Sequence, residues 1–403
     1  MNFKVRVIDL AGSCCRLGAL QFGSKVVETP GCLIYNRSGV VPHLTPDILE
    51  TLDNVPPIMH TPLASIIEEP GLIKLRGYGK GLASFIGYKD NSVYISASDY
   101  QGEAMYQYNE NKSISVWTKT GRTKVTPDDY SKFVEVCRPS WYQSLCDTVP
   151  ANASIKRTRK SVDRTLEFLD QCLKYREKHD SLKTSELWAA VEGGGLVDER
   201  QRSAKESATR PVFGFTLEGF GSDQMNVETI FELLPLTTQN LPVEKPRLIH
   251  AIGSPTNIIK AIESGVDLFD AYYPYNLTEN NLAMVLPLKA INSLSRSSKL
   301  TEVEEENGND SSNDQDRTAT FSLLNLREDR YNEDFSPLVS GCKCFVCSNH
   351  TRAYIHHLII NNEMLGGVLL MTHNLFQYIE FFRCIRTSLK NNKWKELRKL
   401  FDA

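Results

Sequence analysis

The sequence predicts an α/β protein whose main body is a (β/α)8 barrel, with a smaller cysteine-rich subdomain inserted near the C-terminus. Three observations carry this prediction. Short apolar runs alternate with helix-length segments through the middle of the chain, as in repeated βα units of a parallel sheet. Three of these runs lead into glycine or an acid, at Glu192-Gly-Gly-Gly, Leu217-Glu-Gly and Ile252-Gly-Ser-Pro. The 403 residues leave room for eight such units and one appendage.

The main alternative to a barrel is an open, doubly wound parallel sheet. The number of βα units and the chain length favour the barrel. No G-x-G-x-x-G segment follows any predicted strand, which counts against a dinucleotide-binding sheet.

The first hundred or so residues are expected to be rich in strands. Four short runs of β-prone residues are separated by Gly, Pro and Asn, at 26–39, 56–64, 81–88 and 92–100. The period then changes: Val162, Leu166, Leu169 and Leu173 recur at three- and four-residue spacing, which predicts an amphipathic helix over 154–175. Four further strands are expected, at 187–192, 211–217, 247–252 and 266–273.

Three segments follow from these patterns. Residues 1–300 are expected to form the barrel with its β-rich beginning, and 320–403 the subdomain with the C-terminal helices. Residues 302–316 hold seven acids and no base, so 301–319 reads as an acidic, disordered insertion. The tail carries an apolar stripe within 375–385 and seven Lys/Arg from Arg383 onward, which favours a packed helix with a charged face; contact with RNA phosphates or a partner is the alternative.

Composition and sequence pattern limit the cellular compartment and the kinds of partner that we expect. The net charge of −3 means that a nucleic acid would have to meet a local basic patch. No stretch approaches the ~20 apolar residues of a membrane-spanning helix, and the N-terminus lacks the apolar core of a signal peptide. We therefore expect a reducing, cytoplasmic location, either free or peripherally attached to the mitochondrial outer membrane. The ten cysteines are then candidates for burial or metal ligation rather than disulfides.

Cys342, Cys344 and Cys347 form a C-x-C-x-x-C segment. A turn of this spacing can aim three thiolates at one point, which suits tetrahedral zinc. The fourth ligand could be any of four histidines: His350, His356, His357 or His373. His373 is favoured because it follows the apolar run LGGVLLMT, which would return the chain to the cysteines. Four protein ligands leave no open position, so the zinc would be structural.

Asp270 ends a predicted barrel strand in the segment G-V-D-L-F-D. Strand ends on the carboxyl side of a (β/α)8 barrel face the active site, so this carboxylate could be a nucleophile or a general base. It could equally be a structural aspartate. Asp267 is expected on the same side, with Glu192 and Glu218 at neighbouring strand ends.

Several of these segments together resemble the tRNA-guanine transglycosylases. The resemblance is carried by G-V-D-L-F-D, the C-x-C-x-x-C segment, R-A-Y-I-H-H-L and a histidine 26 residues after Cys347. E-T-P-G at Glu28, V-E-G-G at Glu192 and K-P-R at Lys245 occur in the same order as in the family. The resemblance implies a zinc-containing (β/α)8 barrel that exchanges guanine for a 7-deazaguanine base at the anticodon wobble position. It also implies Cys342, Cys344, Cys347 and His373 as ligands of one zinc ion.

The departures from the family pattern concern the catalytic residues. The region taken to correspond to the family's D-S-G-G reads Gly77-YGKGLASFIG and has no aspartate. The family's F-D-E-C-T-P is Leu145-CDTVP, which puts Cys146 at the base-reading aspartate, and the V-Q-G-G glutamine is Glu192. Asp270 stands at the nucleophile position, but the P-T-R after it is Pro274-Tyr-Asn. Groups that act as a unit lose catalysis steeply when some are missing, so Asp270 is not expected to act alone.

Eukaryotic members of the family pair a catalytic with an accessory subunit, and this sequence resembles the accessory kind. The implied partners are the catalytic subunit, in a heterodimer, and tRNAs with GUN anticodons, for aspartate, asparagine, histidine and tyrosine; self-association is expected when the chain is alone. Two other functions stay open: an active transglycosylase that uses Asp270, and a zinc-stabilised binding module unrelated to base exchange.

Overall fold

The computed structural model describes residues 2–7, 13–88, 92–99, 109–221, 225–295 and 320–401. It divides into two compact units, which we treat separately. Unit 1 comprises Met1–Pro46 and Pro56–Tyr272, and unit 2 comprises Asp47–Val55 and Tyr273–Ala403. The acidic segment 301–319 lies outside the described residues, so its disorder stays a prediction. None of the helices in the described part of the chain is long and apolar enough to cross a membrane.

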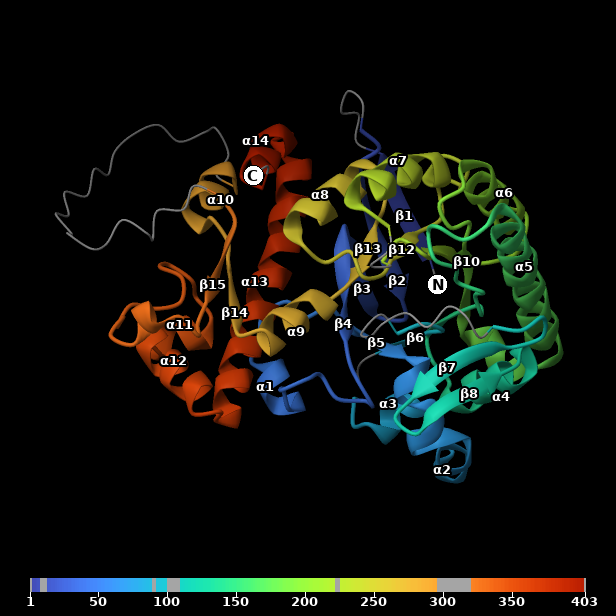
Figure 1. Cartoon of the computed structure of the whole chain (residues 1–403), viewed down its shortest axis with the longest axis horizontal. Helices are drawn as coiled ribbons and strands as arrows, with labels where there is room; N and C mark the ends of the chain where they lie inside the picture. The colour runs from blue at the N-terminus through green and yellow to red at the C-terminus, as the bar shows by residue number, and fades with distance from the viewer. Residues whose placement is uncertain are drawn as a thin grey trace. The chain divides into compact units, whose positions relative to one another are not determined.

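Unit 1 contains a closed barrel of eight parallel strands, which confirms the predicted fold class (Figure 1). Neighbouring strands follow one another in sequence, and β13 closes the barrel by pairing with β4, with Asp270 opposite Leu33. Several strands are buried along their whole length, as expected for a parallel sheet covered on both faces. The strands are β4 (Gly31–Tyr35), β5 (Ile58–Pro62), β6 (Ser92–Ser96), β9 (Trp141–Gln143), β10 (Glu186–Val191), β11 (Gly214–Leu217), β12 (Arg247–Ile249) and β13 (Leu268–Asp270).

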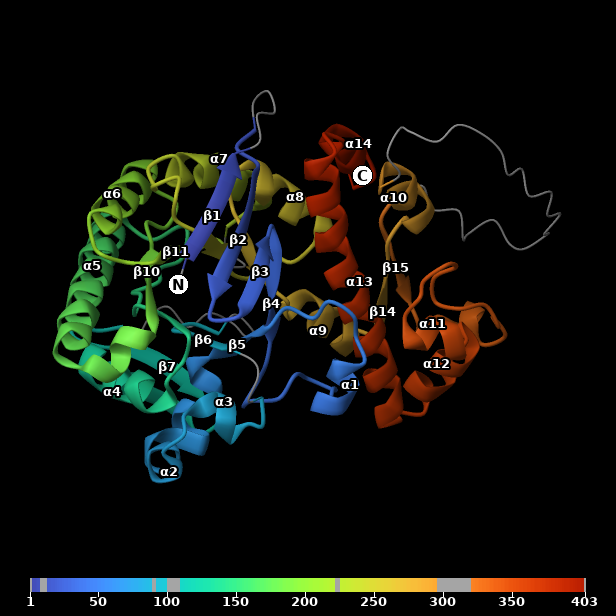
Figure 2. The same cartoon turned by 180° about the vertical axis from the view of Figure 1, so that it is seen from behind.

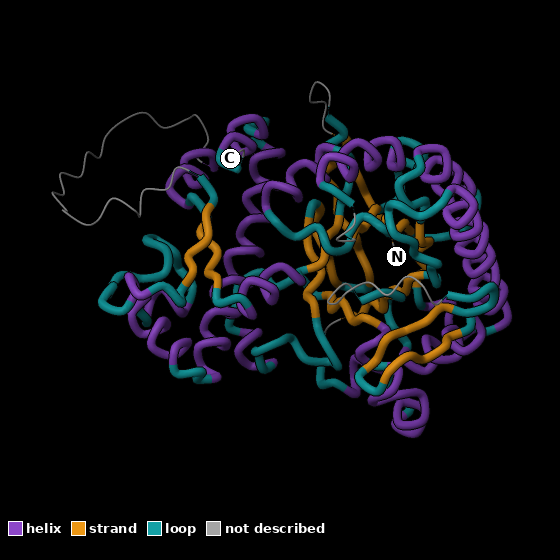
Figure 3. Tube along the Cα trace, in the orientation of Figure 1, coloured by secondary structure: helices purple, strands orange, loops and turns teal. Residues whose placement is uncertain are grey.

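Helices surround the barrel strands (Figure 3). The amphipathic helix predicted over 154–175 is α5 (Ile155–Lys178); Ser154 caps its N-terminus, and Val162, Leu166 and Leu169 are buried. The other helices of unit 1 are α2 (Leu72–Tyr78), α3 (Leu82–Phe85), α4 (Pro127–Cys137), α6 (Val197–Ala208), α7 (Val227–Thr238) and α8 (Pro255–Glu263). A hairpin of β7 (Ile114–Thr118) and β8 (Gly121–Val125) precedes α4.

The prediction of a strand at 81–88 is wrong, because this segment holds α3. It lies between β5 and β6, which are parallel neighbours, and a parallel pair requires a crossover that is usually helical. Gly81 begins α3 with a φ of 80°, and a Cβ there would lie 2.9 Å from the carbonyl oxygen of Cys137. The glycines that looked like strand boundaries are therefore helix boundaries.

A three-stranded antiparallel sheet covers the amino end of the barrel strands (Figure 2). It is formed by β1 (Asn2–Val7), β2 (Arg16–Phe22) and β3 (Lys25–Thr29). Phe22 of this sheet packs edge-on against Trp141, with ring centroids 5.4 Å apart. With this end closed, the carboxyl ends of the strands are left as the place for a functional site.

Unit 2 is built around the long helix α13 (Met364–Lys390), which confirms the predicted tail helix; the stripe of Leu375, Ile379, Phe382 and Ile385 is buried. α13 lies beside β14 (Leu282–Val285), to which Asn374 donates and accepts backbone hydrogen bonds. The remaining elements are α1 (Pro46–Glu50), α9 (Tyr272–Glu279), α10 (Leu288–Ser295), β15 (Ser322–Asn325), α11 (Phe345–Asn349), α12 (Arg352–Ile360) and α14 (Trp394–Lys399).

Candidate functional site: a cysteine cluster and the carboxyl ends of the barrel strands

The structure brings Cys342, Cys344, Cys347 and His373 together in unit 2, and we call these four residues the cysteine cluster. One ligand atom of each lies within 4.8 Å of the others. Cys344 is the N-cap of α11, and its sulfur accepts a hydrogen bond from the Cys347 amide at 3.3 Å. This cap turns the chain so that the cysteines on either side of it face the same point.

His373 completes the cluster from α13, where its side chain is fully buried. Its Nε2 lies 2.9 Å from the carbonyl oxygen of Met284, so Nε2 carries the proton and donates it. Nδ1 faces the cysteines and lies 3.4 Å from the sulfurs of both Cys344 and Cys347. A carbonyl that fixes the tautomer in this way is the usual support of a metal-binding histidine.

The other three candidate histidines do not join this cluster. His356 is buried, but its Nδ1 faces the carbonyl oxygen of Leu326 at 2.8 Å. His357 is exposed and contacts Asn361, and the ring of His350 stacks on Tyr354. These three residues therefore have local packing roles.

The cysteine cluster fits a tetrahedral zinc ion. Zn–S bonds near 2.3 Å and Zn–N bonds near 2.0 Å imply an S···N edge of about 3.5 Å, close to the observed 3.4 Å. Hydrogen bonds among the three cysteines lower the pKa of Cys342 and raise the pKa of Cys347, so Cys342 is the thiolate that its neighbours stabilise. Gln377 also donates to the Cys342 sulfur, at 3.1 Å. The four residues could thus hold a metal ion with no position left open.

Asp270 ends β13 and is almost completely buried in unit 1, with 3% of its surface exposed. One carboxylate oxygen, Oδ2, lies 3.0 Å from the Ala251 amide and 3.2 Å from Nδ1 of His250. The other, Oδ1, accepts from the Tyr272 amide at 3.2 Å. Burial alone raises the pKa of Asp270, but the hydrogen bond and charge of His250 outweigh it and hold the pKa below its ordinary value. Asp270 is therefore an anchored carboxylate.

Two stacked histidines lie beside Asp270. The rings of His60, from β5, and His250, which follows β12, are stacked with centroids 4.7 Å apart. Nε2 of His60 contacts the Ser96 hydroxyl at 2.8 Å, and Nε2 of His250 contacts the Tyr94 hydroxyl at 3.1 Å. Burial, followed by the nearby His250, lowers the pKa of His60 to about 3, so this ring is neutral at physiological pH.

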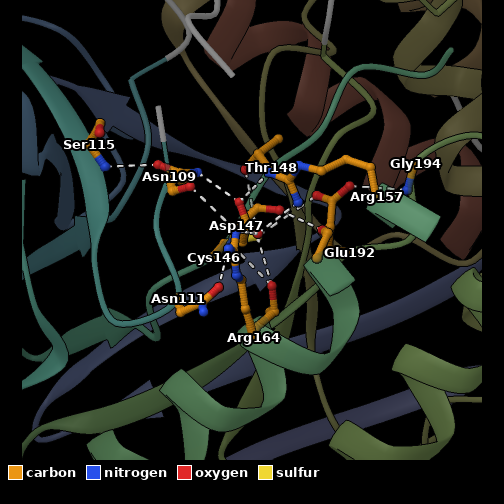
Figure 4. Close-up of polar contacts among 12 residues, drawn as sticks. Asn109, Asn111, Ser115, Cys146, Asp147, Thr148, Arg157, Arg164, Glu192 and Gly194 are labelled. Carbon is orange, nitrogen blue, oxygen red and sulfur yellow. Dashed lines mark hydrogen bonds and ion pairs between the residues drawn. The ribbon is translucent and has the colours of Figure 1, made fainter. Parts of the chain in front are cut away.

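Glu192 directly follows β10, and the resemblance places it where the family has a glutamine (Figure 4). Its Oε1 accepts from the Gly194 amide at 3.0 Å, so the side chain folds back onto its own turn. Its Oε2 lies 3.8 Å from the sulfur of Cys146. Burial raises the pKa of Glu192, although the charge of Arg200 opposes the shift. Glu192 and Cys146 thus contact each other at the place where the resemblance expects base-reading groups.

The structure also shows a buried ion-pair cluster around Asp147, which the sequence analysis missed (Figure 4). Asp147 is fully buried; both of its carboxylate oxygens pair with Arg157, at 2.7 and 2.8 Å. Arg164 lies 2.9 Å from Oδ2, and the Asn109 amide donates to Oδ1 at 3.0 Å. The sequence did hold a signal, since arginines seven residues apart on a predicted helix share one face.

Asp267 was expected on the same side as Asp270, and this is wrong. Asp267 precedes β13, whereas Asp270 ends it, so the two lie at opposite ends of the strand. Asp267 pairs with Arg16 at 3.0 Å and accepts from the backbone amide of Arg247 at 2.8 Å. An interval of three residues also points the side chains to opposite faces of a strand.

The region compared with the family's D-S-G-G segment also needs correction. Residues 77–87 lie in and between α2 and α3, so they follow no barrel strand directly. The strand end nearby is that of β6, where the chain continues as Ala97, Ser98 and Asp99. Burial and then the charge of Asp99 raise the pKa of Tyr35, a residue whose ring packs against Tyr272. Asp99 is therefore an acid near the carboxyl ends of the strands that the sequence analysis overlooked.

Comparison with known proteins agrees with these features. The family model described as queuine tRNA-ribosyltransferase matches residues 11–403. A Trichoplax adhaerens protein named queuine tRNA-ribosyltransferase accessory subunit 2 is 91% identical over 403 residues, covering 100% of both chains. Proteins of the same name from Gallus gallus and Homo sapiens are each 38% identical; the alignments cover 98% and 96% of this chain and 96% of each relative.

Proposed function

Because this chain belongs to the queuine tRNA-ribosyltransferase family, we propose that it is the non-catalytic accessory subunit of a heterodimeric enzyme. The complex would exchange guanine for queuine at the wobble position of tRNAs with GUN anticodons, those for aspartate, asparagine, histidine and tyrosine. This chain would support the catalytic subunit and the bound tRNA. We place it in the cytoplasm, free or attached to the mitochondrial outer membrane.

The observation that carries the non-catalytic assignment is the state of Asp270. A nucleophilic carboxylate has to reach a sugar carbon with a free oxygen lone pair. Here Oδ2 accepts from Ala251 and His250, Oδ1 accepts from Tyr272, and the residue is 3% exposed. Oδ1 keeps a lone pair, but attack would require this buried carboxylate to reach the sugar while three hydrogen bonds stabilise its charge in place.

Base recognition also lacks its usual groups. A site that reads a base edge needs hydrogen-bonding side chains directed at the base. Glu192 instead bonds to Gly194 and lies against Cys146, whose pKa is raised by burial and then by the charge of Glu192. A buried neutral thiol is a weak hydrogen-bonding group, so Cys146 is a poor substitute for an aspartate.

We assign the cysteine cluster to one structural zinc ion. Three sulfurs and one imidazole form a donor set that selects zinc, and four protein ligands leave no position for a substrate. The ion would tie α11 to α13 through Cys344, Cys347 and His373. Its contribution is therefore to the folding of unit 2.

The surface of unit 2 around α11, α12 and the start of α13 is our candidate for the contact with the catalytic subunit. Large apolar side chains are exposed there, which is uncommon on a chain that works alone. Met364 is 88% exposed and Phe335 76%, and the other members are Phe345, Tyr354, Ile360 and Leu365. Stable heterodimers bury apolar and aromatic residues of this kind at their centre.

The basic end of α13 with α14 is our candidate for tRNA contact. Because the net charge is −3, a polyanion has to be met locally. Arg383, Arg386 and Lys390 lie in the last turns of α13, and Lys395, Arg398 and Lys399 follow in α14. Such contacts would weaken steeply with added salt.

The test is an exchange assay with purified components. The chain, the catalytic subunit and an equimolar mixture are each incubated with a GUN-anticodon tRNA and labelled queuine. We expect no incorporation by this chain alone and full incorporation by the mixture. Matched tRNA with a different wobble base serves as the control. Sustained incorporation by this chain alone, abolished in Asp270→Asn, would contradict the proposal.

Asp99 favours a second candidate, an active transglycosylase. It follows β6 and could serve as the acid–base partner of Asp270. This function requires a covalent tRNA adduct on Asp270. The adduct would be resolved on a denaturing gel, and it should be absent in Asp270→Asn and reduced in Asp99→Asn. A wild-type chain that forms no adduct at saturating tRNA would exclude it.

A further inference from the structure

His60, His250 and Asp270 form a second group of metal-ligand side chains, separate from the cysteine cluster; we call it the histidine–aspartate cluster. His60 lies in β5, His250 directly follows β12 and Asp270 ends β13, and all three are buried. One ligand atom of each lies within 4.8 Å of the other two. We propose that this cluster is a second metal site, which binds a divalent transition-metal ion through two imidazoles and one carboxylate.

The spacing of the ligand atoms fits such an ion. Bonds of about 2.0–2.1 Å in a tetrahedral site imply ligand-to-ligand edges of about 3.3 Å. The Nδ1 atom of His250 and the Oδ2 atom of Asp270 are 3.2 Å apart, which is this edge. The ligand atoms of the other two pairs lie within 4.8 Å of each other.

The far side of each ligand is already anchored. Ser96 contacts Nε2 of His60 at 2.8 Å, and Tyr94 contacts Nε2 of His250 at 3.1 Å. The amide of Tyr272 donates to Oδ1 of Asp270 at 3.2 Å. Metal-binding histidines almost always engage the second ring nitrogen in this way, which fixes the ring. An ion would displace the proton that Nδ1 of His250 donates to Asp270 when no metal is bound.

An unsatisfied atom points to a missing ligand. Within the described residues, Nδ1 of His60 has no hydrogen-bond partner, although the residue is only 2% exposed. A buried polar atom without a partner costs roughly 1–3 kcal/mol. Since Nε2 is held by Ser96, Nδ1 is the nitrogen available to an ion, and coordination would remove this cost.

The donor set selects the class of metal. Two imidazoles and a carboxylate suit zinc, iron(II), cobalt(II) or nickel(II), whereas the thiolates of the cysteine cluster favour zinc. Three protein ligands leave at least one position for water or another small ligand. The inference does not depend on the proposed accessory function; it gives Asp270 a role as a metal ligand in either case.

The test measures metal content and cobalt spectra of the full-length chain. Purified protein is dialysed against a mild chelator, which removes ions from an open three-ligand site before a closed four-ligand site. Cobalt(II) is then titrated back. We expect the dialysed chain to keep about one metal ion per chain, in the cysteine cluster, and then to bind about one cobalt(II) ion. The bound cobalt should show visible d–d bands but not the near-ultraviolet thiolate band of a cysteine site.

Matched variants assign the second ion to the cluster. His60→Gln and Asp270→Asn are expected to regain no cobalt while retaining the first ion, which also shows that they fold. Ser96→Ala should bind cobalt about 10–100-fold more weakly, because it removes the outer anchor of His60. His179→Gln is the control, since His179 is partly exposed and pairs with Glu135; it should match the wild type. A wild-type chain that regains no cobalt, or a His60→Gln variant that regains as much as wild type, would overturn the proposal.

Discussion

The cysteine cluster and the histidine–aspartate cluster contain similar side chains but are assembled differently. The cysteine cluster takes three of its four ligands from residues 342–347 and adds one from α13. The histidine–aspartate cluster takes its ligands from β5, from the residue after β12 and from β13, over an interval of 210 residues from His60 to Asp270. The first is a local motif supported by one helix, and the second exists only once the barrel has closed.

The two clusters also differ in how their ligand atoms are satisfied. Sulfur atoms of the cysteine cluster contact mainly each other, His373 and Gln377, so without an ion they would have few strong partners. The carboxylate of Asp270 already accepts from two backbone amides and His250. Loss of metal should therefore unfold the surroundings of one cluster and leave those of the other intact.

The largest expected effect tests this difference directly. Cys344→Ser removes a proposed zinc ligand but leaves a hydroxyl that can still cap α11. We expect unit 2 to lose its folded structure, because binding of a structural zinc contributes about 10 kcal/mol or more. Hydrogen exchange over 320–401 should rise to the rate of an unfolded chain, with unit 1 unchanged. Cys384→Ser is the control, being buried in α13 outside the cluster; protection retained in Cys344→Ser would argue against a zinc-dependent fold.

The next effect tests whether the barrel is held by protein contacts alone. Asp147→Asn leaves Arg157 and Arg164 without their buried counter-charge, which typically costs about 3–5 kcal/mol. We expect a lower midpoint of thermal unfolding for unit 1, measured by circular dichroism. Asp163→Asn is the matched control, since that residue is 64% exposed and pairs with Arg202; its effect should stay under about 1 kcal/mol. Equal effects of the two variants would rule out a special role for Asp147.

A third prediction compares the surfaces of the two units. Met364→Asp places a charge in the apolar surface of unit 2 and should weaken binding to the catalytic subunit by about 10–100-fold, as for a residue at an interface centre. Ile73→Asp is the control, because Ile73 is 85% exposed in unit 1. Titration calorimetry measures both. If only Ile73→Asp weakened binding, the contact with the catalytic subunit would lie on unit 1 and not on unit 2.

The smallest expected effect concerns pH. Burial raises the pKa of Glu192 above its ordinary value of 4.5, so the folded chain holds this proton more tightly than the unfolded chain. As pH rises above 4.5, ionisation of Glu192 therefore lowers the free energy of unfolding. Below pH 4.5 the carboxyl is protonated in both states, and it has no such effect. Glu192→Gln should raise the free energy of unfolding by about 0.5–1 kcal/mol at pH 7 and by nothing at pH 4. Glu206 is 45% exposed on α6, so Glu206→Gln should leave the free energy of unfolding unchanged at both pH values. If Glu192→Gln still raised the free energy of unfolding at pH 4, this account would be contradicted.

Local patterns were enough to predict much of the fold. The periodicity of α5, the strands β10 to β13 and the buried stripe of α13 all follow from the spacing of apolar residues, because each element buries one face or both. The same reasoning placed a strand at 81–88, since short apolar runs do not distinguish a strand from a crossover helix. The need for a crossover between β5 and β6 appears only with the sheet topology.

The candidate sites also differ in how far the sequence alone could predict them. The cysteine cluster was predictable because three ligands share one turn. His60, His250 and Asp99 gave no local signal, since each lies in or beside a different strand and is brought into place by the barrel. Asp267 was misplaced because its position relative to the strand, rather than its distance from Asp270 in the sequence, decides which end of the barrel it occupies.

The pairing of β4 with β13 also has a consequence for synthesis of the chain. About 230 residues separate Tyr35 from Leu268, and at roughly 5–20 residues per second a ribosome needs about 10–50 s to cover that interval. During this time the hydrogen-bonding edge of β4 has no partner from β13, and an unpaired strand edge invites pairing with another chain. Nascent chains released before residue 270 should therefore aggregate, whereas release after it leaves a closed barrel ready to meet its partner.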